Sequence, residues 1–293
     1  MNYVQRAILR LERKGYLNRL ADKPYLKLMF FVRMWKRLDL NDPKTFNEKL
    51  QWLKLYDRKP EYTRMVDKYE AKKYVAERIG EEYIIPTLGV WDSFDEIDFE
   101  ALPPQFVLKT THDCGGLFIC KDKAKLDLAA ARAKMEKHLK RDYFILGREW
   151  PYKNVKPRII AESFMKDSQT QELRDYKFFC FGGVPKVLFI AADRQANEKD
   201  TTIDFFDMEY NHLPIRKGRP NAAKLPEKPV CFEKMKELAA KLSAGIPHVR
   251  VDFYEVDGKV YFGELTFSSG SGMGAFEPEQ WDYTLGSWIK LPK

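Results

Sequence analysis

Alternating apolar and polar positions near the end of the chain predict a β-hairpin. Residues 249–255 and 259–267 are rich in β-branched and aromatic side chains, and a short segment ending at Gly258 separates them. The length of this loop decides which side chains share a face. A two-residue turn would place Asp252 and Glu264 on opposite faces, whereas a three-residue loop with Gly258 in the left-handed conformation places both on one face. We predict the three-residue loop.

The predicted hairpin has one polar face and one apolar face. The polar face carries Arg250, Asp252, Glu264 and Thr266, and the apolar face carries Val251, Phe253, Phe262 and Leu265. Two carboxylates on one face repel each other unless a cation lies between them, and hard oxygen ligands suit Mg²⁺ that carries phosphate groups. The small residues at 268–274 let backbone N–H groups approach an anion. The alternative is an edge hairpin whose polar face is solvated.

The rest of the pattern predicts helices and strands in mixed order. Apolar residues at helical spacing predict helices at residues 3–20, 26–38, 45–55, 67–79, 126–140 and 232–243. Short apolar runs bounded by turn residues predict strands at residues 83–91, 106–109, 117–120, 158–164, 176–181 and 184–192. Segments 147–157 and 214–229 are expected to be irregular. This order predicts an α+β fold with antiparallel sheets.

Length and composition describe a protein with an ordinary core. With 293 residues, the chain is expected to form one large domain or two closely joined domains. The mean hydropathy is −0.51, no stretch approaches the roughly 18 apolar residues of a membrane span, and the first residues lack the pattern of a signal peptide. We therefore expect a cytoplasmic protein.

The four cysteines predict reduced thiols. They show no CxxC pair and no regular spacing. The arrangement of His112, Cys114 and Cys120 differs from known zinc-site spacings and lacks a fourth ligand nearby. A zinc site is therefore not predicted.

Basic residues are concentrated at the start of the chain. The net charge is +8, and residues 1–38 hold ten lysines or arginines against Glu12 and Asp22. Such a segment favours an anionic membrane surface or an acidic glycan. Nucleic acid ranks low because no recognised nucleic-acid-binding motif is present. The helix expected at residues 26–38 either lies on a membrane surface or packs its aromatic side chains on the body of the protein.

A lysine and a glycine loop add to the chemistry of the hairpin. Lys109 ends a predicted strand, and the following loop contains Gly115 and Gly116. This arrangement can hold a cation against phosphate oxygens under a mobile glycine loop. Together with the two acids of the late hairpin, these residues indicate a nucleotide site.

At this point the chain resembles the TupA-like branch of the ATP-grasp superfamily, named for teichuronopeptide biosynthesis. The resemblance is carried by seven phrases that occur in the expected order. They are DPKTFNEKLQWLKLYDR (42–58), VDKYEAKKYV (66–75), FVLKTTHDCGG (106–116), GREWPYKNVKPRIIAE (147–162), DYKFFCF (175–181), VRVDFYEVDGKVYFGELTF (249–267) and WDYTLGSWIKL (281–291). From the first phrase to the last they span nearly all of the chain after residue 41.

The resemblance implies roles for individual residues. It implies that Lys68 and Lys109 contact the ATP phosphates, that Gly115 and Gly116 close over them, and that Glu162, with Ser163 beside it, holds the adenine or ribose edge. It further implies that Asp252 and Glu264 bind Mg²⁺, that Arg250 steadies the transferred phosphoryl group, and that Lys177 and Arg194 contact phosphate or acceptor. His112 and His248 are expected to be structural, so no general base is predicted.

The chain departs from the family pattern at two places. Most ATP-grasp enzymes have an asparagine as the third metal ligand, and Thr266 stands at that position here. A basic helical arm at residues 1–60 also replaces the usual strand-rich N-terminal domain, followed by an ATP-grasp domain at 61–293 with halves at about 61–157 and 158–293. The family's substrate therefore cannot be transferred directly to this chain.

The implied function is an ATP- and Mg²⁺-dependent ligase. Such an enzyme activates a carboxylate as an acyl phosphate and couples it to an amine, and the expected acid is a carboxylated sugar or precursor of a cell-surface polysaccharide. One alternative is a glycosyltransferase, although the sequence has no Asp-x-Asp pair. Another alternative is a non-catalytic protein that binds a nucleotide or a glycan. Nothing in the sequence specifies an oligomeric state.

Overall fold

The computed structural model describes residues 3–168, 173–192 and 201–292. The N-terminal third of the chain is mainly helical. It forms α1 (Tyr3–Arg13), α2 (Asp22–Met34), α3 (Phe46–Tyr56), α4 (Glu61–Val66) and α5 (Glu70–Ile79). The predicted helix at 3–20 ends early, at Arg13, and the chain turns at Gly15 with φ of 79°. The predicted helix at 67–79 begins later, at Glu70, after a turn in which Asp67 Oδ1 accepts from the backbone N–H groups of Tyr69 and Glu70.

Two antiparallel sheets follow, which confirms the predicted fold class. The smaller sheet has the order β1 (Thr87–Trp91), β4 (Ile159–Ser163), β2 (Phe106–Thr110), β3 (Leu117–Cys120). The larger sheet has the order β10 (Lys259–Thr266), β9 (His248–Val256), β5 (Asp175–Phe181), β6 (Val184–Ala192), β7 (Thr202–Phe206), β8 (His212–Leu213). The remaining helices are α6 (Leu128–Leu139), α7 (Phe232–Ser243) and α8 (Gln280–Trp288).

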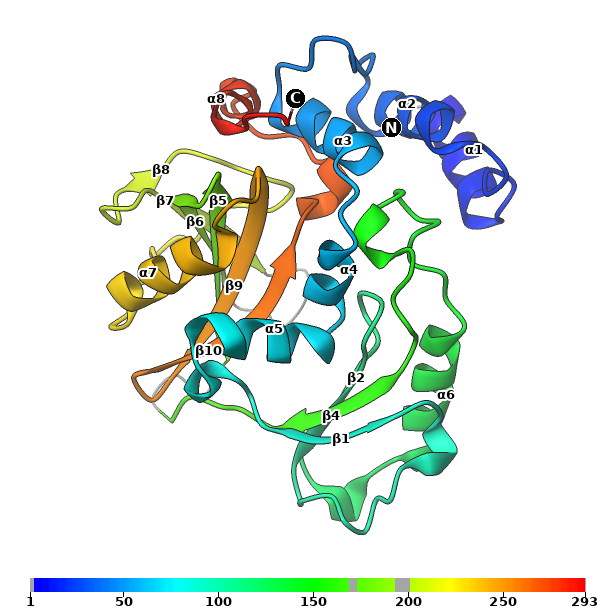
Figure 1. Cartoon of the computed structure of the whole chain (residues 1–293), viewed down its shortest axis with the longest axis vertical. Helices are drawn as coiled ribbons and strands as arrows, with labels where there is room; N and C mark the ends of the chain where they lie inside the picture. The colour runs from blue at the N-terminus through cyan, green and yellow to red at the C-terminus, as the bar shows by residue number, and fades with distance from the viewer. Residues whose placement is uncertain (1–2, 169–172, 193–200, 293) are drawn as a thin grey trace.

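Each sheet has its own core. Helix α6 packs on the smaller sheet around Phe106 and Met135. Helices α4, α5 and α7 cover one face of the larger sheet, and α3 and α8 cover part of its other face around Phe46. In Figure 1 the smaller sheet and α6 lie at the lower end, the larger sheet lies at the left, and α1 and α2 lie at the upper right. No helix in the described part of the chain has the length and apolar character needed to cross a bilayer.

Helix α3 forms where its local sequence predicts it. The Thr45 hydroxyl accepts from the backbone N–H of Glu48 at 3.2 Å, and the Glu48 carboxylate accepts from the backbone N–H of Thr45 at 3.0 Å. This reciprocal capping box satisfies two N–H groups that the helix itself cannot pair. The buried Phe46 and Leu50 then face the aromatic side of the larger sheet. The cap therefore fixes the helix that covers the upper end of β9.

The loop of the late hairpin differs from our prediction. Val256 pairs with Lys259, so the turn has two residues, and both Asp257 and Gly258 have positive φ, 50° and 72°. This is the geometry that suits the right-handed twist of a hairpin. The prediction that Gly258 is left-handed is correct, but the predicted three-residue loop is wrong. A two-residue turn alone would separate the two acids, and a second feature brings them together.

That second feature is a β-bulge at Gly263. The register shifts by one residue between Phe262 and Glu264, so that Phe262 still pairs with Phe253 while Glu264 pairs with Asp252. The extra residue reverses the alternation of faces along β10. Phe262 before the bulge and Leu265 after it are therefore both buried in the core beneath the sheet. Asp252 and Glu264 share the other face, as predicted, for a different reason.

Candidate functional site

The polar face of the hairpin is a network centred on Arg250. Its guanidinium donates two hydrogen bonds of 2.7 Å to the two carboxylate oxygens of Asp252. The same group donates to Glu264 Oε1 at 2.8 Å and to the Thr266 hydroxyl at 3.0 Å. The Thr266 hydroxyl in turn donates to Glu264 Oε1 at 3.2 Å. The four residues predicted to share a face are thus in direct contact.

Lys177 joins this network from the neighbouring strand. It pairs in register with Asp252 across β5 and β9, and its ammonium donates to the Asp252 carboxylate. It also forms an ion pair with Asp175 at 3.2 Å. Lys177 and Arg250 therefore neutralise Asp252, which is fully buried. Such a buried charge is tolerated only when it is paired and hydrogen-bonded in this way.

The two carboxylates differ in exposure and in acidity. Burial raises the pKa of Asp252, and Arg250 and Lys177 oppose this rise. The Glu264 side chain is 45% exposed. Burial raises the pKa of Glu264 as well, but Arg250, Lys177 and Lys68 outweigh it and lower that pKa to about 2. Glu264 is therefore a stable, solvent-accessible anion at neutral pH.

The donor set of this face fits Mg²⁺ in its chemistry. Glu264 offers an ionised, accessible carboxylate, and Asp252 offers a second carboxylate on the same face. Both oxygens of Asp252 are engaged by Arg250 and Lys177, and the Thr266 hydroxyl is engaged by Arg250 and Glu264. Among the described residues, no group of three His, Cys, Asp or Glu side chains is arranged to hold a metal. A metal at this face would depend on the two acids and on other oxygen ligands.

A second cluster, of basic residues, belongs to the smaller sheet and to α5. The Glu162 carboxylate forms ion pairs of 2.5 Å with Lys109 from β2 and with Lys72 from α5. Burial raises the pKa of Glu162, but Lys109 and Lys72 outweigh this effect and lower it. Two lysines thus share one carboxylate. The cluster therefore has a positive charge in excess of what Glu162 neutralises.

Lys68 links the basic cluster to the polar face of the hairpin. This face, with Asp252 and Glu264, is called the acidic face from here on. Lys68 lies between α4 and α5, where its backbone N–H donates to the Thr111 carbonyl at 3.1 Å and its ammonium donates to the Asp113 carbonyl at 2.5 Å. Burial lowers the pKa of Lys68, while the charge of Glu264 raises it and that of Lys109 lowers it further. Lys68 therefore lies within electrostatic reach of both Glu264 and Lys109. The structure brings the early lysine of the sequence close to the late hairpin.

The glycine pair lies at the tip between β2 and β3. Gly115 has φ of 95°, and a Cβ at Gly116 would lie 1.7 Å from the Thr110 hydroxyl oxygen. Both positions therefore require glycine. The loop is anchored beneath its tip, where the buried Asp113 side chain hydrogen-bonds to Thr110 and His138. Gly115 at the tip is exposed, whereas Gly116 is buried.

Of the two remaining predicted residues, the structure describes Ser163 but not Arg194. Ser163 ends β4 directly after Glu162, and its backbone N–H donates to the Pro86 carbonyl at 3.1 Å. It therefore lies beside the basic cluster. Arg194 lies outside the described residues, so its predicted contact stays a prediction.

Three cationic or phenolic side chains near the site were missed by our sequence analysis. Lys72 lies four residues after Lys68, one helical turn further on, and this spacing was a signal that could have identified it. Tyr254 follows Asp252 on the same face of β9, and the charges of Asp175, Glu264, Asp252 and Glu162 and its own burial together raise its pKa well above the usual range. The third is Lys217.

Lys217 comes from an irregular segment with no sequence signal. Its ammonium is buried and has no hydrogen-bond partner among the described residues. It lies 4.2 Å from the centre of the Phe276 ring and 5.6 Å from that of Phe46. Burial lowers the pKa of Lys217 to about 7, with a further lowering by Arg250 and an opposing effect of Asp282. An unpaired buried cation within electrostatic reach of Arg250 is suited to an anionic group of a ligand.

The loop after the hairpin is held from both sides. Ser269 accepts from Arg250 at 3.4 Å. The buried Lys54 of α3 donates to the Ser271 carbonyl at 2.7 Å and to the Gly147 carbonyl at 2.8 Å. Burial lowers the pKa of Lys54 to about 8, against the opposing charge of the buried Glu149. Helix α3 therefore fixes the small-residue loop next to Arg250.

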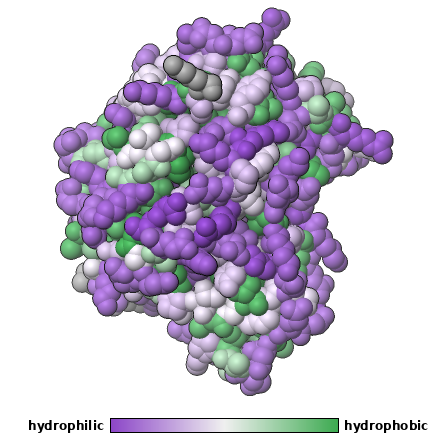
Figure 2. Space-filling view, in the orientation of Figure 1, coloured by the Kyte–Doolittle hydropathy of each residue, from purple (hydrophilic) through white to green (hydrophobic). Residues whose placement is uncertain are grey.

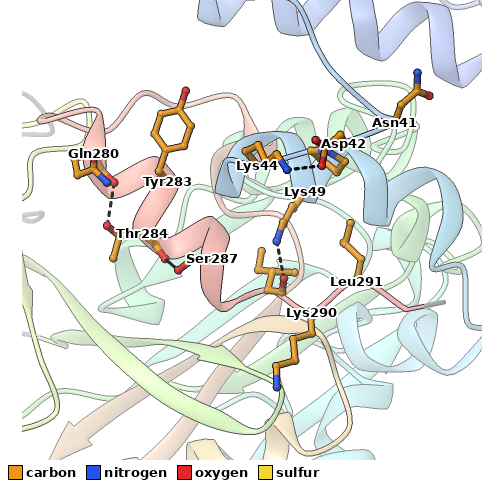
Figure 3. Close-up of a pocket in the computed structure, with 12 residues that line it drawn as sticks. Asn41, Asp42, Lys44, Lys49, Gln280, Tyr283, Thr284, Ser287, Lys290 and Leu291 are labelled. Carbon is orange, nitrogen blue, oxygen red and sulfur yellow. Dashed lines mark hydrogen bonds and ion pairs between the residues drawn. The ribbon is translucent and has the colours of Figure 1, made fainter.

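Two surface cavities have different relations to this site. The larger, of about 800 Å³, lies between the start of α3 and α8 and is shown in Figure 3 with Lys49, Tyr283 and Ser287 in its wall. None of its lining residues belongs to the acidic face or to the basic cluster. The smaller, of about 620 Å³, is lined by Lys72 and by Thr87, the register partner of Glu162. The smaller cavity therefore adjoins the basic cluster.

Comparison with solved structures finds similar folds in ATP-grasp ligases. D-alanine–D-alanine ligase from Bacillus anthracis complexed with ATP has a TM-score of 0.40 and 14% identity, covering 69% of this chain and 53% of that chain. The D-alanine–D-alanine ligase from Helicobacter pylori has a TM-score of 0.41 and 16% identity, covering 84% and 69%. An ATP-grasp RimK domain protein from Sphaerobacter thermophilus has a TM-score of 0.42 and 12% identity, covering 78% and 69%. The chain spans about half the length of the Bacillus enzyme.

Sequence comparison identifies the protein family of this chain. No curated protein is matched by this sequence. The sequence model of the TupA-like ATP-grasp family, however, matches residues 48–290, which include the acidic face, the basic cluster and Lys217. The chain therefore belongs to the TupA-like ATP-grasp family.

Proposed function

We propose that this protein is an ATP- and Mg²⁺-dependent ligase that activates a carboxylate as an acyl phosphate and couples it to an amine. The single observation that carries the proposal is the pairing of Asp252 with Glu264 on one face, with Arg250 between them and Lys68 within electrostatic reach of Glu264. This combination of acids and cations matches the needs of a triphosphate and its metal.

The basic cluster is suited to the phosphate chain and to the nucleoside. Lys68 and Lys109 would neutralise phosphate oxygens, since Lys72 and Lys109 share the single charge of Glu162 and Lys68 lies within electrostatic reach of Lys109. Glu162 and the cavity lined by Lys72 and Thr87 would receive the ribose or adenine. The tip at Gly115 and Gly116, of which Gly115 is exposed, would cover the phosphates with backbone N–H groups and exclude water.

Glu264 and Asp252 would hold Mg²⁺, which when bound neutralises negative charge on the triphosphate. Asp252 would need to exchange a hydrogen bond from Lys177 or Arg250 to do so. The released cation would then be free to bind the oxygens of the transferred phosphoryl group. Arg250 would in this way stabilise charge that develops during transfer.

Lys217 and the loop 268–272 would bind the acceptor side of the reaction. The Lys217 ammonium is buried without a hydrogen-bond partner among the described residues, and Arg250 lies between Asp252 and the Ser269 hydroxyl. An anionic group of the acid or the amine would satisfy the Lys217 charge. Ser269 would help to orient that group next to Arg250.

We further propose that the acid is a carboxylated sugar of a cell-surface polysaccharide or its precursor, and that the amine is an amino acid. The support is the resemblance to the teichuronopeptide branch and the excess of basic side chains, which suits an acidic glycan. Because ATP is a cytoplasmic compound, the proposed reaction takes place in the cytoplasm.

The test is an incubation with ATP, Mg²⁺, a panel of uronic acids and a panel of amino acids. A ligase releases ADP and phosphate only when both an acid and an amine are present. A glycosyltransferase would instead release UDP from a sugar nucleotide, and a binding protein would release neither product. The matched inactive control is Glu264→Gln, which keeps the size of an exposed side chain and removes its charge.

A further inference from the structure

Helix α1 packs on the protein with polar side chains. Gln5 donates from its amide to the Val32 carbonyl at 2.8 Å. Glu12 accepts from the Tyr25 hydroxyl at 2.7 Å and forms an ion pair with Arg33 at 3.0 Å. Both side chains are buried, at 8% and 7% exposure. The inward side of α1 is therefore held by hydrogen bonds.

Ile8 and Leu9 of α1 pack on the hydrophobic core of α2, whereas other apolar side chains of α1 face outward. Val4 and Leu11 are 57% and 43% exposed, and their separation of seven residues places them two turns apart in one row. Arg6, Arg10 and Arg13 are also exposed and follow each other at helical spacing in a second row, on the other flank of the outward surface of the helix. A solvent-facing helix surface that carries both apolar and basic side chains is suited to a membrane interface with anionic lipids. Below, these five residues are called the outer face of α1.

Basic and acidic side chains around α1 differ in their exposure. All ten lysines and arginines of residues 3–38 are exposed. The two acids of this segment are turned inward or paired, since Glu12 is buried and Asp22 binds Arg58 at 2.6 Å. Arg33 pairs with Glu12 and Lys36 pairs with Glu279, and the remaining basic side chains give the segment a positive surface. Such a surface attracts anionic lipid head groups over the range of a Debye length.

Aromatic side chains add to this surface. Tyr3, Tyr16 and Trp35 are 84%, 68% and 56% exposed. The Trp35 ring packs against that of Phe31 at 4.8 Å between ring centres, with the two rings tilted by 30°. Tyrosine and tryptophan favour the interface between lipid and water. In Figure 2 the projection at the upper right, where Figure 1 places α1 and α2, shows hydrophilic purple with green patches between.

We propose that the outer face of α1, supported by the basic side chains of α2, binds an anionic phospholipid surface with the helix lying parallel to the membrane. Charge complementarity selects this occupant, because a basic surface with an outward apolar row needs both anionic groups and an apolar phase. The proposal is independent of the reaction proposed above. Membrane binding would bring the site close to lipid-linked substrates.

The experiment is sedimentation of the full chain with vesicles. Phosphatidylcholine vesicles that contain phosphatidylglycerol should bind the protein, and pure phosphatidylcholine vesicles should not. Added salt should release it. The double variants Val4→Glu with Leu11→Glu, and Arg6→Glu with Arg10→Glu, should each weaken binding at least about tenfold. Both should keep the helical content and the nucleotide binding of the unchanged protein.

The matched control pairs an apolar and a basic side chain elsewhere on the surface. Val230 is 88% exposed, and the Lys224 side chain is 89% exposed. Val230→Glu with Lys224→Glu should leave vesicle binding unchanged. The proposal is overturned by absence of binding to anionic vesicles, by equal binding to neutral vesicles, or by unaltered binding of the α1 variants. Self-association of the protein that the α1 variants abolish, without vesicle binding, would assign the face to a second copy instead.

Discussion

Asp252 on β9 and Glu264 on β10 are direct partners across the hairpin, and the bulge at Gly263 is what places them side by side. Gly263 adds one residue between the Phe262–Phe253 pair and the Glu264–Asp252 pair. The core therefore keeps its aromatic side chains while both carboxylates face Arg250. The bulge is small in extent, but the geometry of the acidic face depends on it.

A side chain at Gly263 should therefore damage the site. A Cβ there would lie 3.1 Å from the Asp252 carbonyl oxygen and 3.2 Å from the Tyr254 ring. We expect Gly263→Val to lower the free energy of unfolding by about 1–3 kcal/mol and to weaken Mg²⁺-dependent ADP binding at least about tenfold. Urea unfolding and calorimetric titration measure the two effects.

The control for this variant is Gly182→Asn. Gly182 also has positive φ, 58°, but a Cβ there meets nothing within 4 Å, and asparagine tolerates this conformation. Its ADP binding should be unchanged. If Gly263→Val bound ADP and Mg²⁺ as tightly as the control, the bulge would have no role in the site.

The two acids should differ in their contribution to stability. Asp252→Asn leaves Arg250 and Lys177 with a neutral partner in a fully buried position, and it should cost about 3–5 kcal/mol of unfolding free energy. Glu264→Gln changes a side chain that is 45% exposed and should cost less than about 1 kcal/mol. Urea unfolding of both variants at neutral pH gives the comparison. Equal costs would mean that Asp252 is not the buried centre of the network.

At pH values where Lys217 is charged, it should lower the free energy of unfolding of the protein. Its pKa is about 7 in the folded protein against 10.5 for an ordinary lysine, so the folded state binds fewer protons than the unfolded state between these values. The free energy of unfolding of the natural protein should therefore rise with pH from about 7 to 10.5. Lys217→Met should be more stable at pH 7 by about 2–4 kcal/mol, and this advantage should shrink through the same window.

Measurements of ligase activity test the proposed ligand-binding role of Lys217 separately from its effect on stability. If the ammonium binds an anionic group of the acid or the amine, Lys217→Met should lose ligase turnover while ADP binding is retained. The control Lys234→Met changes a lysine that is 45% exposed, and it should affect neither property. A Lys217→Met variant that is less stable and fully active would show that this lysine has only a structural role.

Thr266 allows the departure from the family pattern to be tested. Its hydroxyl links Arg250 to Glu264. Thr266→Asn should strengthen Mg²⁺ binding about two- to tenfold in the presence of ADP, because an amide oxygen is a better ligand than this engaged hydroxyl. Thr266→Val has nearly the same shape without the hydroxyl, and it should not strengthen binding. Weaker Mg²⁺ binding by the asparagine variant would place the metal away from this position.

The fold was predictable where local chemistry and packing agree. The helix predicted at 45–55 and the strands predicted at 176–181 and 184–192 form close to their predicted positions. Elements outside the predicted set include α4, α8 and β7. Helix α4 is six residues long, and β7 lies between a charged segment and an irregular one, so neither contains enough periodic positions to be recognised.

The sequence also contained a signal for the register of the hairpin, and our prediction did not use this signal. Phe262 and Leu265 are both core residues, but their separation of three breaks the two-residue alternation of a strand. That change of phase, with a glycine between, is the signature of a bulge. Lys217 could not be found in this way, because its position depends on Phe46 and Phe276 from distant parts of the chain.

The most direct test of the proposed site is a calorimetric titration of ATP into the full chain, with Mg²⁺ and then with a chelator. We expect one equivalent of bound ATP in the presence of Mg²⁺, weaker binding after chelation, and loss of the Mg²⁺ dependence in Glu264→Gln. ATP binding with the same affinity and the same Mg²⁺ dependence in Glu264→Gln, or no ATP binding by the unchanged protein, would contradict this expectation.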